Sequence, residues 1–221
     1  TGHGGDGLNT AATRPFDRDT ALRIARAFLP KHPLGNRWDY YYTLAKLRSD
    51  PLYPGVLQAL RGSDAPVLDL GCGLGLLAHA LRADGQHMAY RGVDNDAAKI
   101  TRANKVAAKN ALVDTRFDVV DLAGGPPAHQ GSVAILDVLQ YLDAQGQRNL
   151  IAQVSAMLTP GARLVIRTAL GDDSRRGKTS RVTDRLANLT GWMQSRPKCY
   201  PDAAAMRAQP LDAGRHTTFA P

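Results

Sequence analysis

Three glycines fall within five residues of an otherwise apolar stretch, "VLDLGCGLGLLAHAL" at residues 67–81. The aliphatic run before the glycines predicts a buried strand, and the spacing after them predicts a helix. Glycine weakens both kinds of element, so its repetition at the junction indicates a tight turn with positive φ angles and a close approach to the backbone. We therefore predict a strand–turn–helix unit whose main chain lies directly against a ligand.

From residue 66 onward, short aliphatic segments alternate with segments of helical spacing. We predict strands over 66–70, 89–94, 115–121, 132–137 and 162–170, with helices over 74–84, 96–110 and 143–158. This alternation indicates a doubly wound α/β fold with a mostly parallel sheet covered on both faces. The carboxyl ends of the strands then meet at one edge, where such sheets bind ligands.

Three further helices are predicted before the sheet, within 17–30, 36–50 and 51–62. We expect three parts in the chain: a disordered leader or expression remnant at 1–15, a helical cap at 16–62, and the α/β core at 63–221. After the fifth strand we expect a helix and one short strand, "RHTTFAP".

Composition narrows the class of protein. The 221 residues, of which 43% are hydrophobic, suit a domain of ordinary size, and the apolar runs are too short to cross a bilayer. One of the two cysteines, Cys72, lies in the glycine turn and the other is Cys199, so a reducing, cytoplasmic location is expected. All 20 acidic residues are Asp, which leaves no Glu to act as a base or ligand.

The chain is basic, with a formal net charge of +8. Part of this charge is concentrated in residues 175–185, which hold Arg175, Arg176, Lys178, Arg181 and Arg185. Such a segment suits RNA phosphates, an anionic small molecule or an acidic protein, and it is equally typical of a solvated loop.

The acids near the turn indicate the polarity of the ligand. The third glycine comes too early for the dinucleotide pattern G-x-G-x-x-G, and Asp69 would repel a pyrophosphate but suit a cationic amino group. Asp94 ends the second predicted strand, where a carboxylate can accept both hydroxyls of a ribose. Asp121 and Asp137 end the next two strands. Each of these acids alone is also explained as a helix cap.

Together these residues resemble the class I S-adenosylmethionine-dependent methyltransferases, over residues 64–170. "VLDLGCGLG" is similar to that family's first motif, D-x-G-x-G-x-G, and "GVDND" to its ribose-binding motif. "VVDLA", "SVAILDVLQYL" and "LTPGARLVI" resemble the motifs that follow. The resemblance implies a Rossmann-like fold, S-adenosyl-L-methionine as cofactor and S-adenosyl-L-homocysteine as product.

Carried over residue by residue, the resemblance implies a set of cofactor contacts. The methionyl end would lie against Asp69 and the turn residues Gly71, Cys72, Gly73 and Gly75. The ribose would meet Asp94, with Asn95 beside the adenine. Asp121 and Leu122 would border the adenine, and Asp137 and Val138 would line the floor near the sulfonium. From the N-terminal helices, Lys46 or Arg37 would pair with the methionyl carboxylate.

The chain departs from the family in two places. Tyr141 stands where many small-molecule members carry a histidine, and no residues remain for the last antiparallel strand. Because a phenol keeps its proton at neutral pH, we expect Tyr141 to orient the acceptor. The other candidate catalytic residue is His32, on a segment suited to form a lid. His79 and His87 are interpreted as packing or surface residues. No metal is expected, since the acids show no ligand-like clustering.

We expect an enzyme that methylates a small molecule, at a hydroxyl oxygen, by in-line displacement. A weak resemblance to bacterial aryl-polyene and other pigment-pathway methyltransferases implies an acceptor carried on an acidic acyl carrier protein. One alternative is an RNA methyltransferase that uses the basic segment 175–185. A second is a non-catalytic S-adenosylmethionine-binding protein.

Overall fold

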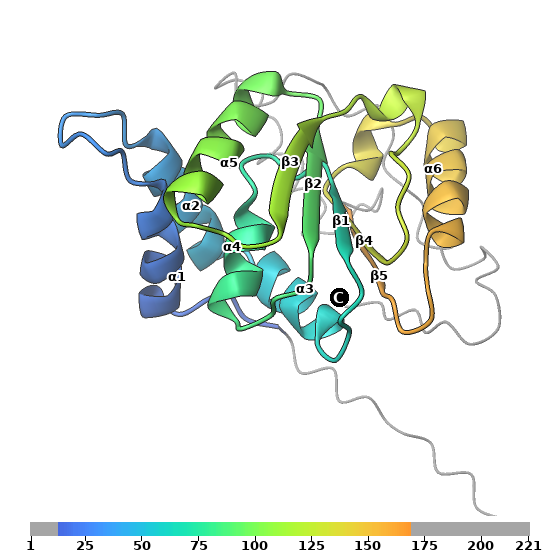
Figure 1. Ribbon diagram of the computed structural model, residues 1–221, viewed down its shortest axis with the longest axis horizontal. Coiled ribbons are helices and arrows are strands. Elements are labelled where there is room, and N and C mark those ends of the chain that lie inside the picture. The colour runs from blue at the N-terminus through green and yellow to red at the C-terminus, as the bar shows by residue number, and fades with distance from the viewer. Residues whose placement is uncertain (1–12, 169–221) are drawn as a thin grey trace, which may run out of the picture.

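Five parallel strands form the centre of the protein, in the order β3-β2-β1-β4-β5 (Figure 1). The computed structural model describes residues 13–168. The strands are β1 (Val67–Leu70), β2 (Tyr90–Asp94), β3 (Thr115–Val119), β4 (Ser132–Leu136) and β5 (Leu164–Arg167). The order of the strands reverses between β1 and β4, which places a topological switch point at the carboxyl end of β1. The predicted doubly wound parallel sheet is confirmed.

Helices precede the sheet and connect its strands. The first group is α1 (Arg18–Ala25), the 3-10 turn η1 (Arg26–Phe28), α2 (Trp38–Ser49) and α3 (Leu52–Leu60). The crossovers contain α4 (Leu76–Ala83), α5 (Ala97–Lys109) and α6 (Ala144–Ala156), with short turns η2 (Leu122–Gly124) and η3 (Leu139–Tyr141). All helices predicted up to residue 158 are present, with ends that differ by a few residues.

Two apolar layers sandwich the sheet because alternate residues of each strand face opposite sides. On one side Val67 of β1 packs with residues of α3, α4 and α5, and on the other Leu68 and Leu70 pack with α6. All four residues of β1 are buried. Figure 1 shows α6 on one side of the sheet and the remaining long helices on the other. Asp69 shares its side of the strand with Val67, and therefore faces the N-terminal helices.

Aspartates begin several of the helices. Asp17, Asp96 and Asp143 each accept hydrogen bonds from main-chain N–H groups in the first turn of α1, α5 and α6. These caps satisfy donors that a helix leaves unpaired at its amino end. Part of the Asp-rich composition is thus explained by helix capping.

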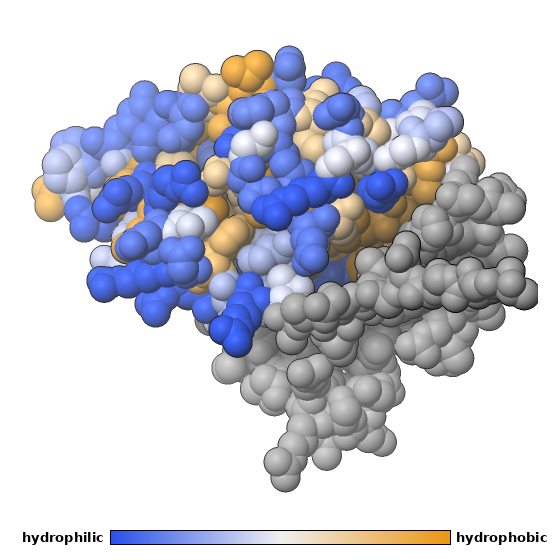
Figure 2. Space-filling model, turned by 90° about the horizontal axis from the view of Figure 1, so that it is seen from below, coloured by the Kyte–Doolittle hydropathy of each residue, from blue (hydrophilic) through white to orange (hydrophobic). Residues whose placement is uncertain are grey.

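The amino ends of the strands form the lower edge of the molecule in Figure 1. Seen from that edge, the described surface is mainly hydrophilic, and its largest apolar area lies toward the side of α6 (Figure 2). Within residues 13–168, no helix is both long and apolar enough to cross a membrane. Residues 1–12 of the predicted leader, the basic segment 175–185 and the last predicted helix and strand lie outside the described residues.

Candidate functional site

The glycine turn follows β1 and leads into α4 at the carboxyl edge of the sheet. Gly71, Gly73 and Gly75 have φ angles of 77°, 56° and 75°, in the left-handed region predicted for them. A Cβ on Gly71 would collide with Val138, and one on Gly75 would collide with the ring of Phe117. Only Gly73 faces open space, with no atom within 4 Å of a Cβ built on it. Glycine is therefore needed at positions 71 and 75 to make room for protein side chains, and at position 73 it leaves open space. Contact of the three glycines with a ligand stays a prediction.

Cys72 turns its polar groups inward. Its N–H donates to the Val93 carbonyl at 3.0 Å, and its own carbonyl accepts the N–H of Gly75 at 2.9 Å. Its Sγ lies against Gly92, where a Cβ would be only 2.8 Å away, and burial raises the pKa of the thiol well above its usual value. Cys72 therefore takes part in the internal packing of the turn, and its contact with the cofactor stays a prediction.

Asp69 is the most deeply buried acid of the site, with a residue exposure of 2%. Its Oδ2 accepts a hydrogen bond of 2.5 Å from the Tyr90 hydroxyl, while its Oδ1 is buried and has no hydrogen-bond partner among the described residues. Burial raises the pKa of Asp69 to about 7, although the Tyr90 hydrogen bond opposes this shift. An unpartnered buried oxygen is costly. A donor from a cationic ligand would satisfy it.

Asp94 faces the same turn from the end of β2. Its Oδ2 accepts the N–H of Gly73 at 2.9 Å, and its Oδ1 accepts the N–H of Asp96 at 2.9 Å. The half-buried carboxylate is thereby held in one orientation with lone pairs left over, which suits a pair of ligand hydroxyls. Asn95, beside it, is exposed.

Asp121 and Leu122 lie beyond the end of β3. Asp121 is exposed and caps η2, accepting the N–H of Ala123 at 2.9 Å. Leu122 is half-buried and packs against the cluster formed with α6. The capping interpretation of Asp121 is thus confirmed, and a contact with adenine remains a prediction.

Asp137 follows β4 with a φ of 58° and belongs to an ion-pair cluster. Arg167 Nη1 lies 2.8 Å from Oδ2 of Asp137 and 2.8 Å from Oδ2 of Asp50. Lys46 Nζ lies 2.7 Å from Asp50 and 3.8 Å from Asp137. Burial disfavours the ammonium, but the charges of Asp137 and Asp50 outweigh it and raise the pKa of Lys46. Lys46 is therefore already paired within the protein. The expected pairing with a ligand carboxylate would have to replace or share these contacts.

The two candidate catalytic residues occupy very different places. Tyr141 ends η3, directly after β4, and is half-buried. His32 is exposed in the loop between η1 and α2, which projects from the side of the molecule at the left of Figure 1. The structure therefore places Tyr141 at the carboxyl edge of the sheet and does not bring His32 to the acids.

Sequence reasoning missed four residues that surround these acids: Asp50, Tyr53, Tyr90 and Arg167. Burial, together with the charges of neighbouring groups that include Asp69 and Asp50, raises the pKa of Tyr53 well above its usual value. Tyr53 therefore lies close to both acids. Tyr90 and Arg167 were predictable as members of the strands expected over 89–94 and 162–170. Their partners were not, because they belong to distant segments.

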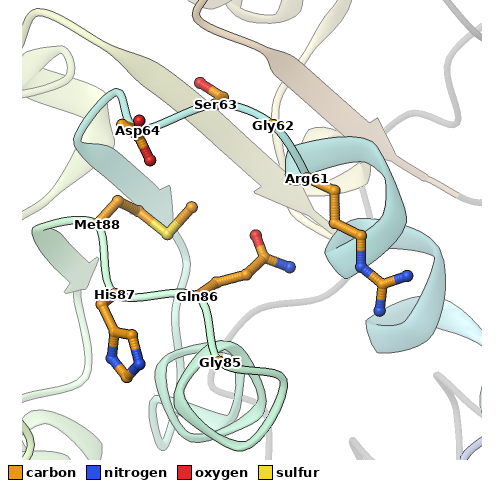
Figure 3. A pocket seen from close by; sticks show the side chains of 8 residues that line it. All are labelled: Arg61, Gly62, Ser63, Asp64, Gly85, Gln86, His87 and Met88. Carbon is orange, nitrogen blue, oxygen red and sulfur yellow. The ribbon is translucent and has the colours of Figure 1, made fainter.

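A cavity of about 440 Å³ lies at the opposite edge of the sheet (Figure 3). It is lined by residues 61–64 and 85–88, the loops that lead into β1 and β2. These loops are at the amino ends of the strands, so the cavity is separate from the glycine turn. His87, interpreted as a packing or surface residue, lines this cavity. No group of three or more His, Cys or Asp side chains suited to a metal ion occurs within the described part of the chain.

Comparisons with known proteins agree with this architecture. Residues 67–161 match the family model described as "Methyltransferase domain". The chain is 30% identical over 107 residues to a ubiquinone biosynthesis O-methyltransferase of Xylella fastidiosa, and the match covers 48% of this chain and 42% of that protein. It is 28% identical over 136 residues to a ribosomal protein L11 methyltransferase of Pseudomonas fluorescens, covering 60% of this chain and 44% of the relative.

Solved structures share the fold. The YcgJ protein from Bacillus subtilis aligns with a TM-score of 0.55 at 16% identity, covering 71% of this chain and 64% of its own. The mitomycin 7-O-methyltransferase MmcR aligns with a TM-score of 0.52 at 18% identity, covering 66% of this chain and 43% of its own. With its parallel sheet, its glycine turn and the match to the family model, the segment 67–161 is a methyltransferase domain of the class I S-adenosylmethionine-dependent kind.

Proposed function

We propose that this protein binds S-adenosylmethionine at the carboxyl edge of the sheet and transfers its methyl group to a hydroxyl oxygen of a small molecule. The observation that carries the proposal is the buried Oδ1 of Asp69, which lacks a partner among residues 13–168 and lies on the strand that leads into the open glycine Gly73. A site with one unsatisfied anion beside accessible backbone fits the amino group of a methionyl moiety.

The remaining cofactor contacts follow from the positions of the acids. Asp69 would hold the amino group, and Asp94, oriented by the Gly73 and Asp96 amides, would accept the ribose hydroxyls. Asn95, Asp121 and Leu122 would border the adenine. When bound, the cofactor supplies a methyl group on a positively charged sulfur, which an acceptor nucleophile displaces. The protein contributes alignment and exclusion of water.

On the acceptor side, the N-terminal helices reach the edge through the end of α2 and the start of α3. Tyr53 and Lys46 come from these helices, and Tyr141 is the last residue of η3, which follows β4. We assign to Tyr141 the orientation of the acceptor. His32 is left without a catalytic role, because its side chain is exposed on the projecting loop.

Oxygen is favoured as the methylated atom by the names of two similar proteins, a ubiquinone biosynthesis O-methyltransferase and mitomycin 7-O-methyltransferase. The chain spans only 42% of the length of that curated relative, so its acceptor is not carried over. The predicted alternatives, RNA and an acceptor on an acidic acyl carrier protein, enter as outcomes of the test.

Calorimetry with S-adenosylhomocysteine tests the cofactor site, comparing the wild type with Asp69→Asn. The matched control is Asp64→Asn, which changes an exposed acid at the cavity of Figure 3. We expect binding that Asp69→Asn weakens and Asp64→Asn leaves unchanged. Methyl-labelled cofactor is then incubated with free phenols, carrier-bound phenols and total RNA. Label on a phenol supports the proposal, label on RNA alone overturns the acceptor class, and binding without transfer identifies a non-catalytic binder.

A further inference from the structure

Arg167 links three segments that are far apart in the chain. As the last residue of β5, it donates from Nη1 to Oδ2 of Asp50 and to Oδ2 of Asp137, each at 2.8 Å. Lys46 completes the group by contacting the same two carboxylates. The cluster of Lys46, Asp50, Asp137 and Arg167 is balanced in charge, so it ties the junction of α2 and α3 to the ends of β4 and β5 without a net charge.

The first arm of this link runs through Asp137 to the glycine turn. Asp137 has a left-handed backbone, which is uncommon for a residue other than glycine and requires support from its surroundings. Arg167 supports it twice, since the Arg167 carbonyl accepts the Asp137 N–H at 2.8 Å and its guanidinium binds the carboxylate. The next residue, Val138, packs so closely on Gly71 that a Cβ there would collide with it.

The second arm runs through Asp50 to the start of α3. While Oδ2 of Asp50 binds Arg167, its Oδ1 accepts the N–H of Leu52 at 3.0 Å, at the first residue of that helix. Tyr53 comes next, and its surroundings include the charges of Asp69, Asp50 and Asp137. The same guanidinium thus orients an element on each side of the glycine turn.

We propose that Arg167 is a positioning residue that sets the floor of the cofactor site through Asp137 and Val138 and its cover through Asp50 and Tyr53. This inference rests on the proposed function, because it assigns the geometry to cofactor binding. Isolated exposed ion pairs contribute little. This one differs because one guanidinium joins two carboxylates whose side chains are 11% and 33% exposed, and because a strained backbone depends on it.

The test compares Arg167→Gln with Arg61→Gln. Arg61 makes a 2.7 Å ion pair with Asp84 at the amino edge, so its loss controls for the removal of an ion pair elsewhere. We expect Arg167→Gln to weaken S-adenosylhomocysteine binding by about tenfold in calorimetry, an effect of the size seen for coupled groups. Arg61→Gln should leave affinity within about twofold. Thermal melting of each variant separates a loss of affinity from a loss of folding, and Arg167→Lys should recover part of the affinity.

A double-variant cycle then asks whether Arg167 acts through Asp137. Arg167→Gln combined with Asp137→Asn should bind no more weakly than Arg167→Gln alone, since both remove the same contact. Should Arg167→Gln not fold, Asp137→Asn alone reads the same arm. Wild-type affinity in Arg167→Gln, or additive losses in the cycle, overturns this inference and leaves the proposed function standing. A wild type that does not bind S-adenosylhomocysteine overturns both.

Discussion

The hydroxyl of Tyr90 donates to one oxygen of Asp69 at 2.5 Å, while the other oxygen of that carboxylate is buried without a partner in the described structure. The two residues lie on neighbouring strands, β2 and β1. One oxygen is thus held by the protein, and the other is left for a ligand. This asymmetry makes Asp69 the natural anchor for a cationic amino group and gives binding a dependence on pH.

Cofactor affinity should rise with pH up to neutrality. Because the pKa of Asp69 is raised to about 7 by burial, the free protein holds a proton there at lower pH, and a bound ammonium group must displace it. Affinity should therefore rise by up to about tenfold per pH unit between pH 5.5 and pH 7. Calorimetry with S-adenosylhomocysteine measures the profile. In Asp69→Asn the profile should be flat and the binding weak, and a slope that survives this change would contradict the assignment.

Tyr90→Phe should shift that profile to higher pH. The Tyr90 hydrogen bond favours the ionised carboxylate, so its removal raises the pKa of Asp69 further. It also leaves both oxygens of a buried acid without a protein donor, which should cost roughly 1–3 kcal/mol of unfolding free energy. Urea unfolding measures the cost, and the calorimetric profile measures the shift. An unchanged profile would mean that the hydroxyl does not control the carboxylate.

Gly71 and Gly73 should respond differently to alanine. Gly73→Ala meets open space, so it should cost only about 1 kcal/mol for its left-handed backbone while its methyl group obstructs the cofactor. In Gly71→Ala the new methyl group collides with Val138, so this variant should lose roughly 1–3 kcal/mol more unfolding free energy than Gly73→Ala. Adding Val138→Ala should recover part of the stability of Gly71→Ala and none of the affinity of Gly73→Ala. Urea unfolding and calorimetry together distinguish the two outcomes.

The difference between these glycines could not be predicted from the sequence, because it depends on contacts with distant residues. The strands, the turn and the placement of Asp94 at the end of a strand follow from local pattern and from the rules of parallel sheets, so they were predictable. What packs against Gly71 or Gly75 depends on Val138, which follows β4, and on Phe117 of β3, both distant in the chain. Likewise, Lys46 was readable as a cation near the site, but its partners Asp50 and Asp137 depend on how α2 lies over the ends of β4 and β5. The periodicity of a sequence predicts local elements, and it does not predict which distant segments come into contact.

Two buried groups should oppose each other in the pH dependence of stability. Burial lowers the pKa of His79, a residue 6% exposed beside the ring of Phe28, to about 4. The unfolded chain then binds the proton more readily, so stability is lost as pH falls from about 6.5 toward 4. Asp69, with its raised pKa, acts in the other direction, because the folded protein binds its proton first and gains stability over nearly the same range.

The unfolding free energies of the two single variants should therefore change with pH in opposite directions, relative to the wild type. His79→Leu removes the group that destabilises the folded protein at low pH, so its stability relative to the wild type should rise as pH falls from 7 to 4.5. Asp69→Asn removes the stabilisation that protonation of Asp69 gives the folded protein, so its stability relative to the wild type should fall over the same range. At their limits, shifts of this size correspond to about 3 kcal/mol for His79 and about 4 kcal/mol for Asp69. Urea unfolding followed by circular dichroism at pH 4.5, 5.5 and 7 measures both slopes. If His79→Leu and the wild type change in parallel, then His79 is protonated in the folded state, and its assignment to the core beside Phe28 is wrong.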